Sequence, residues 1–332
     1  MNNEQVLKIS VALCTYNGER FIEAQLNSIL NQSRLPDEVI VCDDGSTDNT
    51  VDIVRGVSLS YPGIVRVYKN NVNLGCVKNF EQAIRRAGGS VIFLSDQDDV
   101  WFRDKIKVMC APFTENRGIG LVYSDALITD MALQHRGSTL FKRRRNLRLN
   151  MVRSARQLIK GVGINGCTMA FRSALKEFAL PVCRGWGHDH WIAFIAHAVT
   201  GVQPISKPLM FYRRHGGNCG IDLTLEDGWL NKWQRILQTS GMAVYTGDRE
   251  RWGSMYRRLL EISAGDLETA YRFRFLEFLL ECERRLEFAC QRERFKQDMR
   301  IKRLPLLWGL FKGDYHRHLR GIRSFMKDLL LR

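Results

Sequence analysis

The sequence predicts an α/β protein: a mainly parallel sheet with helices on both faces, followed by a mostly helical C-terminal region. In the first hundred residues, short runs rich in Val, Ile and Leu alternate with stretches whose apolar residues recur at the helical period. Strands that alternate with helices form parallel sheets, because each crossover helix packs on one face. After about Leu225 glycine and proline become rare and Arg/Glu-rich helical segments dominate, so we expect domains at 1–225 and 226–332.

The predicted elements follow one another in a regular order. Leu7–Cys14 is an apolar run that ends at a turn, so it is predicted to be a buried strand. From Glu19 the apolar residues fall on one helical face, and Pro36-Asp37 breaks the chain before the next strand. The remaining expected elements are strands Glu38–Cys42, Ile64–Tyr68 and Val91–Leu94, helices Asp48–Val54 and Val77–Ala87, a helix starting near Trp101, and a helical segment Tyr271–Gln291.

Polar clusters follow three of the predicted strands. Thr15-Tyr16-Asn17 comes after the first strand, Asp43-Asp44-Gly45-Ser46 after the second, and Asp96–Asp99 after the fourth. In sheets of this kind, ligands bind in the crevice beyond the carboxyl ends of the strands. The three clusters are therefore predicted to converge on one rim of the sheet.

The acidic run Asp96-Gln97-Asp98 suggests a site for a hard cation. Carboxylates two residues apart at the end of a strand can reach one Mg²⁺ or Mn²⁺, and such an ion neutralises a leaving diphosphate. The alternative is a solvated turn in which Gln97 and Asp99 cap the helix expected near Trp101. For Asp43–Asp48 the alternatives are a carboxylate that accepts a hydrogen bond from a pyrimidine N3–H, or a local turn in which Asp48 caps a helix.

On these and later motifs the sequence resembles the family 2 glycosyltransferases of the Rossmann-like GT-A fold. Within that family it is similar to the bacterial rhamnosyltransferase-like subgroup, and the resemblance extends from about Ile9 to Gly220 but not over the C-terminal third. The motifs are Val11–Thr15 with Tyr16-Asn17-Gly18-Glu19, Asp43–Asp48, Asn73-Leu74-Gly75, Asp96–Asp99 with Trp101, Gly166–Phe171, His188-Asp189 with Trp191, and Tyr212–Gly216.

The resemblance implies a role for each matching position. Asp189 matches the general base and Asp98 the metal ligand, while Asp96 would lie by the ribose or make a second metal contact. Asp44 would recognise the pyrimidine base of the nucleotide. The other residues expected to bind the nucleotide sugar are Thr15, Tyr16, Asn17, Glu19, Asn73, Gly75, Lys78, His188 and His215.

Four of these residues have a second interpretation from their chemistry. His215 would complete the metal shell or touch the diphosphate, as Arg213 and Arg214 could, but a lone histidine can equally be structural. Lys78 is either a phosphate contact or a solvated helix residue. For the His188–Asp189 pair the alternative is simply the polar start of a helix.

The resemblance further implies an inverting, metal-dependent hexosyltransferase that uses Mg²⁺ or Mn²⁺. The expected reaction moves rhamnose from dTDP-rhamnose to a hydroxyl of a glycan, expected to be lipid-linked, in O-antigen or capsule synthesis. A UDP-hexose donor is the alternative. A nucleotidyltransferase is disfavoured because the chain lacks a phosphate loop of the G-x-x-x-x-G-K type. A non-catalytic anionic-lipid or nucleic-acid binding protein is disfavoured because no nucleic-acid motif accompanies the basic residues, and no nucleic-acid partner is expected.

The net charge of +15 is concentrated in two parts of the chain. Between Met131 and Lys176 there are eleven Lys or Arg and no acid, and we expect Arg143–Arg145 to attract a polyprenyl-diphosphate-linked acceptor. Near the C-terminus, Leu319–Leu330 has an apolar face beside basic residues, typical of a helix that lies on an anionic membrane, although packing on the enzyme is the alternative.

The same sequence favours a location in the cytoplasm. Nine scattered cysteines without a CxxC pair indicate reduced thiols. The chain shows no signal peptide and no run of about 18 apolar residues. We therefore expect a cytoplasmic protein that is peripheral on the cytoplasmic face of the inner membrane.

Overall fold

The computed structural model describes residues 7–143, 164–215, 241–262 and 267–297, and these form two compact units. The first unit contains the described residues up to Val182 and from Gly187 to His215. The second contains Cys183–Trp186 and the described residues from 241 onward. The predicted domain boundary at 225/226 lies outside the described residues and stays a prediction. None of the helices in those four ranges is long and apolar enough to cross a membrane.

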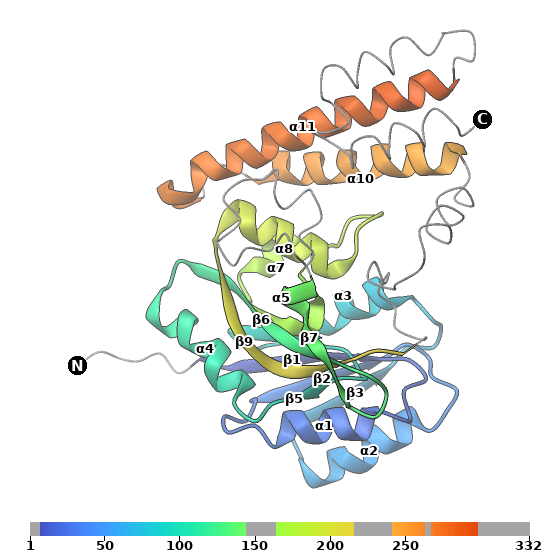
Figure 1. The fold of residues 1–332 in the computed structure, drawn as a ribbon, viewed down its shortest axis with the longest axis vertical. Helices are drawn as coiled ribbons and strands as arrows, with labels where there is room; N and C mark the ends of the chain where they lie inside the picture. Colours follow the sequence, from blue (N-terminus) through green and yellow to red (C-terminus); the bar gives the residue numbers. More distant parts are fainter. Residues whose placement is uncertain (1–6, 144–163, 216–240, 263–266, 298–332) are drawn as a thin grey trace. The chain divides into compact units, whose positions relative to one another are not determined.

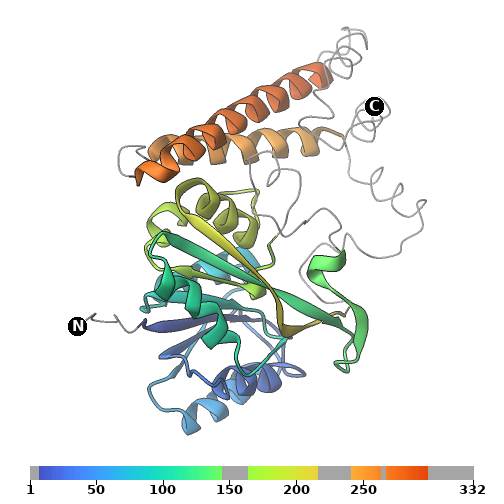
Figure 2. The ribbon, with the colours of Figure 1, turned by 60° about the vertical axis from the view of Figure 1, so that its left-hand side comes forward.

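The first half of the sheet is parallel, as predicted. Its four strands lie in the order β3-β2-β1-β4, and helices α1 and α2 lie on one side while α3 lies on the other (Figures 1 and 2). The α/β prediction is therefore confirmed. The strands are β1 (Ile9–Thr15), β2 (Glu38–Asp43), β3 (Val65–Lys69) and β4 (Val91–Ser95), and the helices are α1 (Ile22–Leu30), α2 (Thr50–Ser60) and α3 (Cys76–Arg86).

The second half of the sheet contains antiparallel pairs. β8 (Met169–Arg172) runs antiparallel to both β4 and β6 (Ile119–Thr129), and β9 (Gly201–Arg213) is parallel to β6. β7 (His135–Thr139) pairs with β6. The other elements are β5 (Val100–Trp101), α4 (Lys105–Glu115), α5 (Leu140–Arg143), the 3₁₀ turn η1 (Gly166–Thr168), α7 (Leu175–Ala179) and α8 (His188–Val199).

The expectation of a helix starting near Trp101 is wrong. Trp101 lies in β5, which pairs with Met210 of β9, and the helix begins only at Lys105. A partner more than one hundred residues away decides the conformation here. Gln97 and Asp99 consequently do not cap a helix.

The core of the first unit explains why the central strand tolerates only apolar residues on one face. Ile9, Val11 and Leu13 alternate along β1 and have no exposed surface, and they share one cluster with Leu26 and Ile29 of α1. β1 pairs with β2 on one edge and with β4 on the other, so its carboxyl end lies between the carboxyl ends of two parallel neighbours. That end leads into the candidate site.

Among its described residues, the second unit contains two long helices that pack on each other, α10 (Gly241–Glu261) and α11 (Thr269–Gln297). Its described interior includes Leu259 and Phe275, which are at most 2% exposed. Trp186 also belongs to this unit, where its ring meets Trp252 edge-on with centroids 5.3 Å apart. The expected helical segment Tyr271–Gln291 lies within α11, whereas the predicted membrane helix lies outside the described residues.

Candidate active site

The loops after β1 and β2 are joined by side-chain hydrogen bonds. Thr15 Oγ1 donates to Asp43 Oδ1 at 2.8 Å. Asn17 Oδ1 accepts the Thr47 N–H at 2.9 Å, and Glu19 Oε2 accepts the Asn49 N–H at 3.1 Å. The structure thus brings these predicted nucleotide-binding residues to one rim, where they already hold the two loops together. Tyr16, in the same loop, is 47% exposed.

Asp44 is buried and accepts hydrogen bonds from the loop before α3. Its Oδ1 accepts the Leu74 N–H and its Oδ2 the Gly75 N–H, both at 2.8 Å, and Asn70 Nδ2 donates to Oδ1 at 3.0 Å. Asn73 Oδ1 also accepts the Gly75 N–H, at 3.1 Å. Asp44, Asn73 and Gly75 therefore lie together as expected, and Asp44 fixes the shape of this loop.

Lys78 has an ion-pair partner on its own helix. Its Nζ lies 2.8 Å from Glu81 Oε2, and slightly more than half of the lysine side chain is exposed. Glu81 also binds Arg85 at 2.8 Å. A phosphate contact by Lys78, as predicted, would have to compete with this pair.

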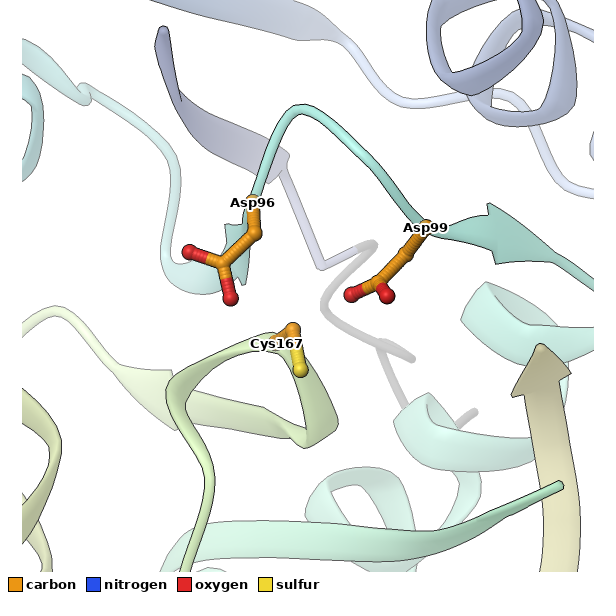
Figure 3. Close-up of side chains that lie close together, drawn as sticks. All are labelled: Asp96, Asp99 and Cys167. Carbon is orange, nitrogen blue, oxygen red and sulfur yellow. The ribbon is translucent and has the colours of Figure 1, made fainter. Parts of the chain in front are cut away.

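Asp96, Asp99 and Cys167 form a compact group at the end of β4. One ligand atom from each lies within 4.8 Å of the others, and their side chains point toward one another (Figure 3). Asp99 is 1% exposed, and its Oδ1 accepts the Arg213 N–H at 3.1 Å. The Cys167 side chain also makes a hydrogen bond with the Asp99 carboxylate.

This group fits a divalent cation through its carboxylates. Burial raises the pKa of Asp99 well above its ordinary value, and the nearby Asp98 and Asp96 add to the shift. A cation would offset both the burial and the repulsion, and Mg²⁺ and Mn²⁺ prefer carboxylate oxygen. The Cys167 thiol fits these ions less well, because thiolate suits softer metals.

Lys105 lies buried beneath the same group. Its Nζ donates to the Cys167 carbonyl at 2.6 Å and lies 4.1 Å from the centre of the Trp101 ring. Burial lowers the pKa of Lys105 to about 8, although Cys167, Asp99 and Asp96 act in the opposite direction. No periodic pattern in the sequence indicates this role, because Lys105 is the first residue of α4 and its partner lies 62 residues away.

Asp98 has a different neighbour from Asp99. Its Oδ2 lies 2.8 Å from His215 Nε2, and the His215 ring stacks on Phe21 with centroids 4.9 Å apart. Arg213 Nε donates to the Asp98 carbonyl at 2.7 Å, and its guanidinium also binds the Met131 carbonyl. His215 therefore lies next to Asp98, the predicted metal ligand. The Arg213 guanidinium donates hydrogen bonds to two backbone carbonyl oxygens.

His188 and Asp189 begin α8 but face different surroundings. The His188 ring is buried and stacks on Phe80 of α3 at 4.0 Å, and within the described residues its Nε2 has no hydrogen-bond partner. Burial lowers the pKa of His188, so the ring is neutral near pH 7. Asp189 is 26% exposed, and its Oδ1 accepts the His190 N–H at 2.7 Å.

The turn at Gly166 connects Asp189 to the acidic group. A Cβ added to Gly166 would lie 2.8 Å from His188 Nε2 and 3.5 Å from the Asp189 Cβ. The next residue is Cys167, whose thiol belongs to the acidic group. Gly166 therefore lies near the predicted base, and the next residue along the chain belongs to the acidic group.

Two features of the site were absent from the sequence-based assignment: Asp99 and Cys167 as members of the acidic group. The proximity of Asp99 and Cys167 depends on the pairing of β8 with β4, and no local sequence pattern predicts this pairing. Of the basic stretch Met131–Lys176, residues 144–163 lie outside the described part, and so does most of the Arg143–Arg145 run.

Comparison with known proteins gives a consistent picture. The family model for glycosyl transferase family 2 matches residues 10–178. The chain is 42% identical to the dTDP-rhamnosyl transferase RfbG of Shigella flexneri over 99 residues, which are 29% of this chain and 34% of that protein. It is 25% identical to the UDP-Glc:alpha-D-GlcNAc-diphosphoundecaprenol beta-1,3-glucosyltransferase WfgD of Escherichia coli, over 56% of this chain and 69% of WfgD. The matches span 34% to 66% of the length of the first four curated relatives.

Solved structures show the same fold. The structure of S. aureus TarS 1-349 in complex with UDP-GlcNAc superposes with a TM-score of 0.56 and 19% identity, over 90% of this chain and 78% of that one. The predicted GT-A fold is confirmed. Because the family model covers half of the sequence, the chain belongs to glycosyl transferase family 2.

Proposed function

We propose that this protein is an inverting, metal-dependent glycosyltransferase that moves a sugar from a nucleotide donor to a glycan hydroxyl in bacterial polysaccharide synthesis. The observation that carries the proposal is the Gly166-Cys167 turn, where a Cβ added to Gly166 would lie 3.5 Å from the Asp189 Cβ and where Cys167 belongs to the acidic group. A sugar transfer needs a proton acceptor beside one reactant and a charge-neutralising site beside the leaving diphosphate. The turn lies near a candidate for each of these two groups, and this proximity supports the proposal.

In the proposed reaction the acceptor oxygen bonds to the anomeric carbon while the bond from that carbon to the diphosphate breaks. The Asp189 carboxylate takes the hydroxyl proton, and its 26% exposure leaves it accessible to an acceptor. Asp96 would hold a divalent cation together with Asp98 or Asp99, and that cation would neutralise charge on the departing diphosphate. The buried His188 ring, which stacks on Phe80, has a lowered pKa and adds no positive charge next to Asp189 near pH 7.

The donor that we propose is dTDP-rhamnose. Support comes from the 42% identity to the dTDP-rhamnosyl transferase RfbG, although that match covers about a third of the relative. A UDP-hexose is the second candidate, because WfgD, named for its UDP-Glc donor, matches over a longer stretch at lower identity. In both cases the nucleoside end of the donor would lie at the loops after β1 and β2.

A nucleotide-sugar panel tests this proposal directly. The full chain is incubated with a polyprenyl-diphosphate-linked glycan as acceptor, with dTDP-rhamnose, UDP-glucose or UDP-GlcNAc as donor and with Mg²⁺ or Mn²⁺, and release of nucleoside diphosphate is measured. We expect release from dTDP-rhamnose above the other donors, loss of release in EDTA, and an inverted anomeric centre in the product by NMR. Absence of release from every donor, together with absence of nucleoside diphosphate binding, would contradict the proposed function.

The acceptor that we propose is a polyprenyl-diphosphate-linked glycan in O-antigen or capsule synthesis, used by a cytoplasmic enzyme peripheral to the inner membrane. The support is the sequence alone: the Arg143–Arg145 run and the basic, apolar-faced tail. Liposome co-sedimentation of the full chain and of a version ending near Arg300 tests the membrane part. We expect only the full chain to bind anionic vesicles, and equal weak binding by both would contradict it.

A further inference from the structure

Gln97 joins the two loops between which a nucleotide sugar would lie. It stands between Asp96 and Asp98, yet its side-chain amide turns to the loop after β1. Gln97 Oε1 accepts the Tyr16 N–H at 2.8 Å, and Gln97 Nε2 donates to the Tyr16 carbonyl at 3.1 Å. One side chain therefore satisfies both backbone groups of one residue, which we call the Gln97–Tyr16 bridge.

The bridge lies where the regular pairing of the two strands has ended. The parallel register of β1 and β4 runs only as far as Leu13 and Ser95. Beyond these residues β1 continues to pair with β2, up to the pair Thr15 and Asp43. The chain after β4 no longer pairs with β1. The Gln97 amide restores a connection across this gap, where backbone hydrogen bonds no longer hold the loops at a fixed spacing.

Gly18 provides the space that the bridge occupies. A Cβ added to Gly18 would lie 2.2 Å from Gln97 Oε1 and 2.6 Å from Gln97 Cδ. The Gly18 backbone is anchored, because its N–H donates to Thr50 Oγ1 at 2.7 Å and its carbonyl accepts the first N–H groups of α1. A methyl group at this position would therefore displace the glutamine rather than the loop.

We propose that Gln97 is a positioning residue for the donor: it holds the nucleoside-binding loop at a fixed distance from the acidic group. This inference rests on the proposed function, since the two loops matter together only for a ligand with a nucleoside at one end and a diphosphate at the other. A bridge formed before binding lowers the ordering cost of the ligand site. Its loss should raise the donor KM and leave kcat close to the original value.

The test is a double-mutant cycle on nucleotide affinity. The dissociation constants of dTDP and UDP are measured with Mn²⁺ for the wild type, Gln97→Ala, Gly18→Ala and the double variant. We expect each single change to weaken binding about tenfold, the scale of two neutral hydrogen bonds. The double variant should also be about tenfold weaker rather than a hundredfold, because Gly18→Ala acts only by displacing Gln97. Additive losses, or single variants that bind like the wild type, would overturn the proposal.

A matched pair of substitutions separates positioning from general damage. Gln97→Met keeps the length of the side chain but removes both hydrogen bonds, and Gln82→Met makes the same change on α3, where Gln82 binds only Arg86 of its own helix among the contacts described. We expect a raised donor KM for Gln97→Met and unchanged kinetics for Gln82→Met.

Hydrogen exchange of the ligand-free protein tests the bridge without any donor. The Tyr16 amide should exchange about tenfold faster in Gln97→Met than in the wild type or in Gln82→Met, because it loses its acceptor. Equal exchange would refute the bridge even if the enzyme binds nucleotides. If the wild type binds neither dTDP nor UDP, the proposed function fails and the positioning role fails with it, while the exchange result still decides whether the bridge exists.

Discussion

At the scale of single residues, neighbouring carboxylates in one short loop contact different side chains. Asp98 faces His215, whereas Asp99 turns inward to Asp96 and Cys167. The spacing of the acids in the sequence indicates a site but not this difference, because the difference depends on Cys167 in η1 and on His215 after β9, which are distant in the sequence. The sequence locates the acidic loop and predicts Asp189 as the base, which stays a prediction, but it contains no sign of Lys105 or of the Gln97–Tyr16 bridge.

Asp189 gives the most direct residue-scale prediction. We expect Asp189→Asn to bind dTDP with Mn²⁺ as the wild type does, and to lose transfer by about a hundredfold to ten-thousandfold, the contribution of a general base. The measurement is calorimetric binding beside acceptor-dependent diphosphate release. Asp52→Asn on the exposed face of α2 is the matched control and should keep full activity. Full transfer by Asp189→Asn would require another base.

Lys105 gives a prediction about stability. Lys105→Met removes the donor to the Cys167 carbonyl and the cation beside Trp101, and leaves that buried carbonyl unpaired. We expect a loss of about 1–3 kcal/mol in the free energy of unfolding, measured by urea denaturation. Lys107→Met, on the exposed side of the same helix, should unfold like the wild type. Identical midpoints for the two variants would show that the buried amine contributes nothing.

At the scale of elements, the sequence predicts the parallel half of the sheet better than the other half. β1, β2 and β4 are fully buried strands, so their apolar runs are continuous and easy to recognise. β9 contains two prolines and partly exposed residues, and its pairing with β6 shifts register several times. Its pairing with β5, rather than local sequence, makes Trp101 a strand residue.

Glu38 joins the amino ends of several strands and gives an element-scale prediction with a pH dependence. Its Oε1 accepts hydrogen bonds from Ser10 Oγ and the Gly88 N–H, both at 2.6 Å, and its Oε2 lies 3.2 Å from Arg66. Burial raises the pKa of Glu38, but these hydrogen bonds and the positive charges of Arg66 and Lys8 outweigh burial and leave it below its ordinary value of 4.5. The charged form is therefore the stabilising one.

The sign of the pH effect follows from that shift. The stabilisation by Glu38 is complete above its ordinary pKa and is lost as the pH falls through the lower pKa of the folded state. We expect Glu38→Gln to be less stable than the wild type by about 1–3 kcal/mol at pH 7, with a smaller difference at about pH 3.5. Urea denaturation at both pH values measures this, with Glu23→Gln on α1 as the exposed control. A difference that is constant with pH would contradict the assignment.

At the scale of the whole molecule, the chain forms a sheet-based unit and a helical unit, and the described helices of the second unit agree with the helical pattern in the sequence. The sequence could not predict that Cys183–Trp186 belongs to the helical unit. These four residues interrupt the catalytic motifs, and no composition change marks them. Only their packing against α10 reveals the assignment, through the Trp186 Nε1–H that donates to the Arg251 carbonyl at 2.9 Å.

The helical unit gives the last prediction. Trp252 is 8% exposed and lies between the Trp186 ring and the Arg285 guanidinium, which is 4.9 Å from its ring centre. Trp252→Ala should lower the free energy of unfolding by about 3–5 kcal/mol, the usual cost of removing a large buried ring. Phe273→Ala, at a position on α11 that is 82% exposed, should change it little. Thermal unfolding followed by near-ultraviolet circular dichroism compares them, and equal midpoints would contradict the packing role of Trp252.

Cys183–Trp186 belongs to the helical unit, although the residues on both sides of it belong to the sheet unit. This limits how the protein can be divided into separate domains. The chain leaves the sheet unit after Val182 and returns at Gly187, two residues before Asp189. A recombinant fragment that stops at the predicted boundary near residue 225 would retain Trp186 but lack Arg251 and Trp252, so the indole N–H and ring would lose the partners described above. The helical unit therefore cannot be exchanged as a cassette between related enzymes unless the segment before α8 is exchanged with it.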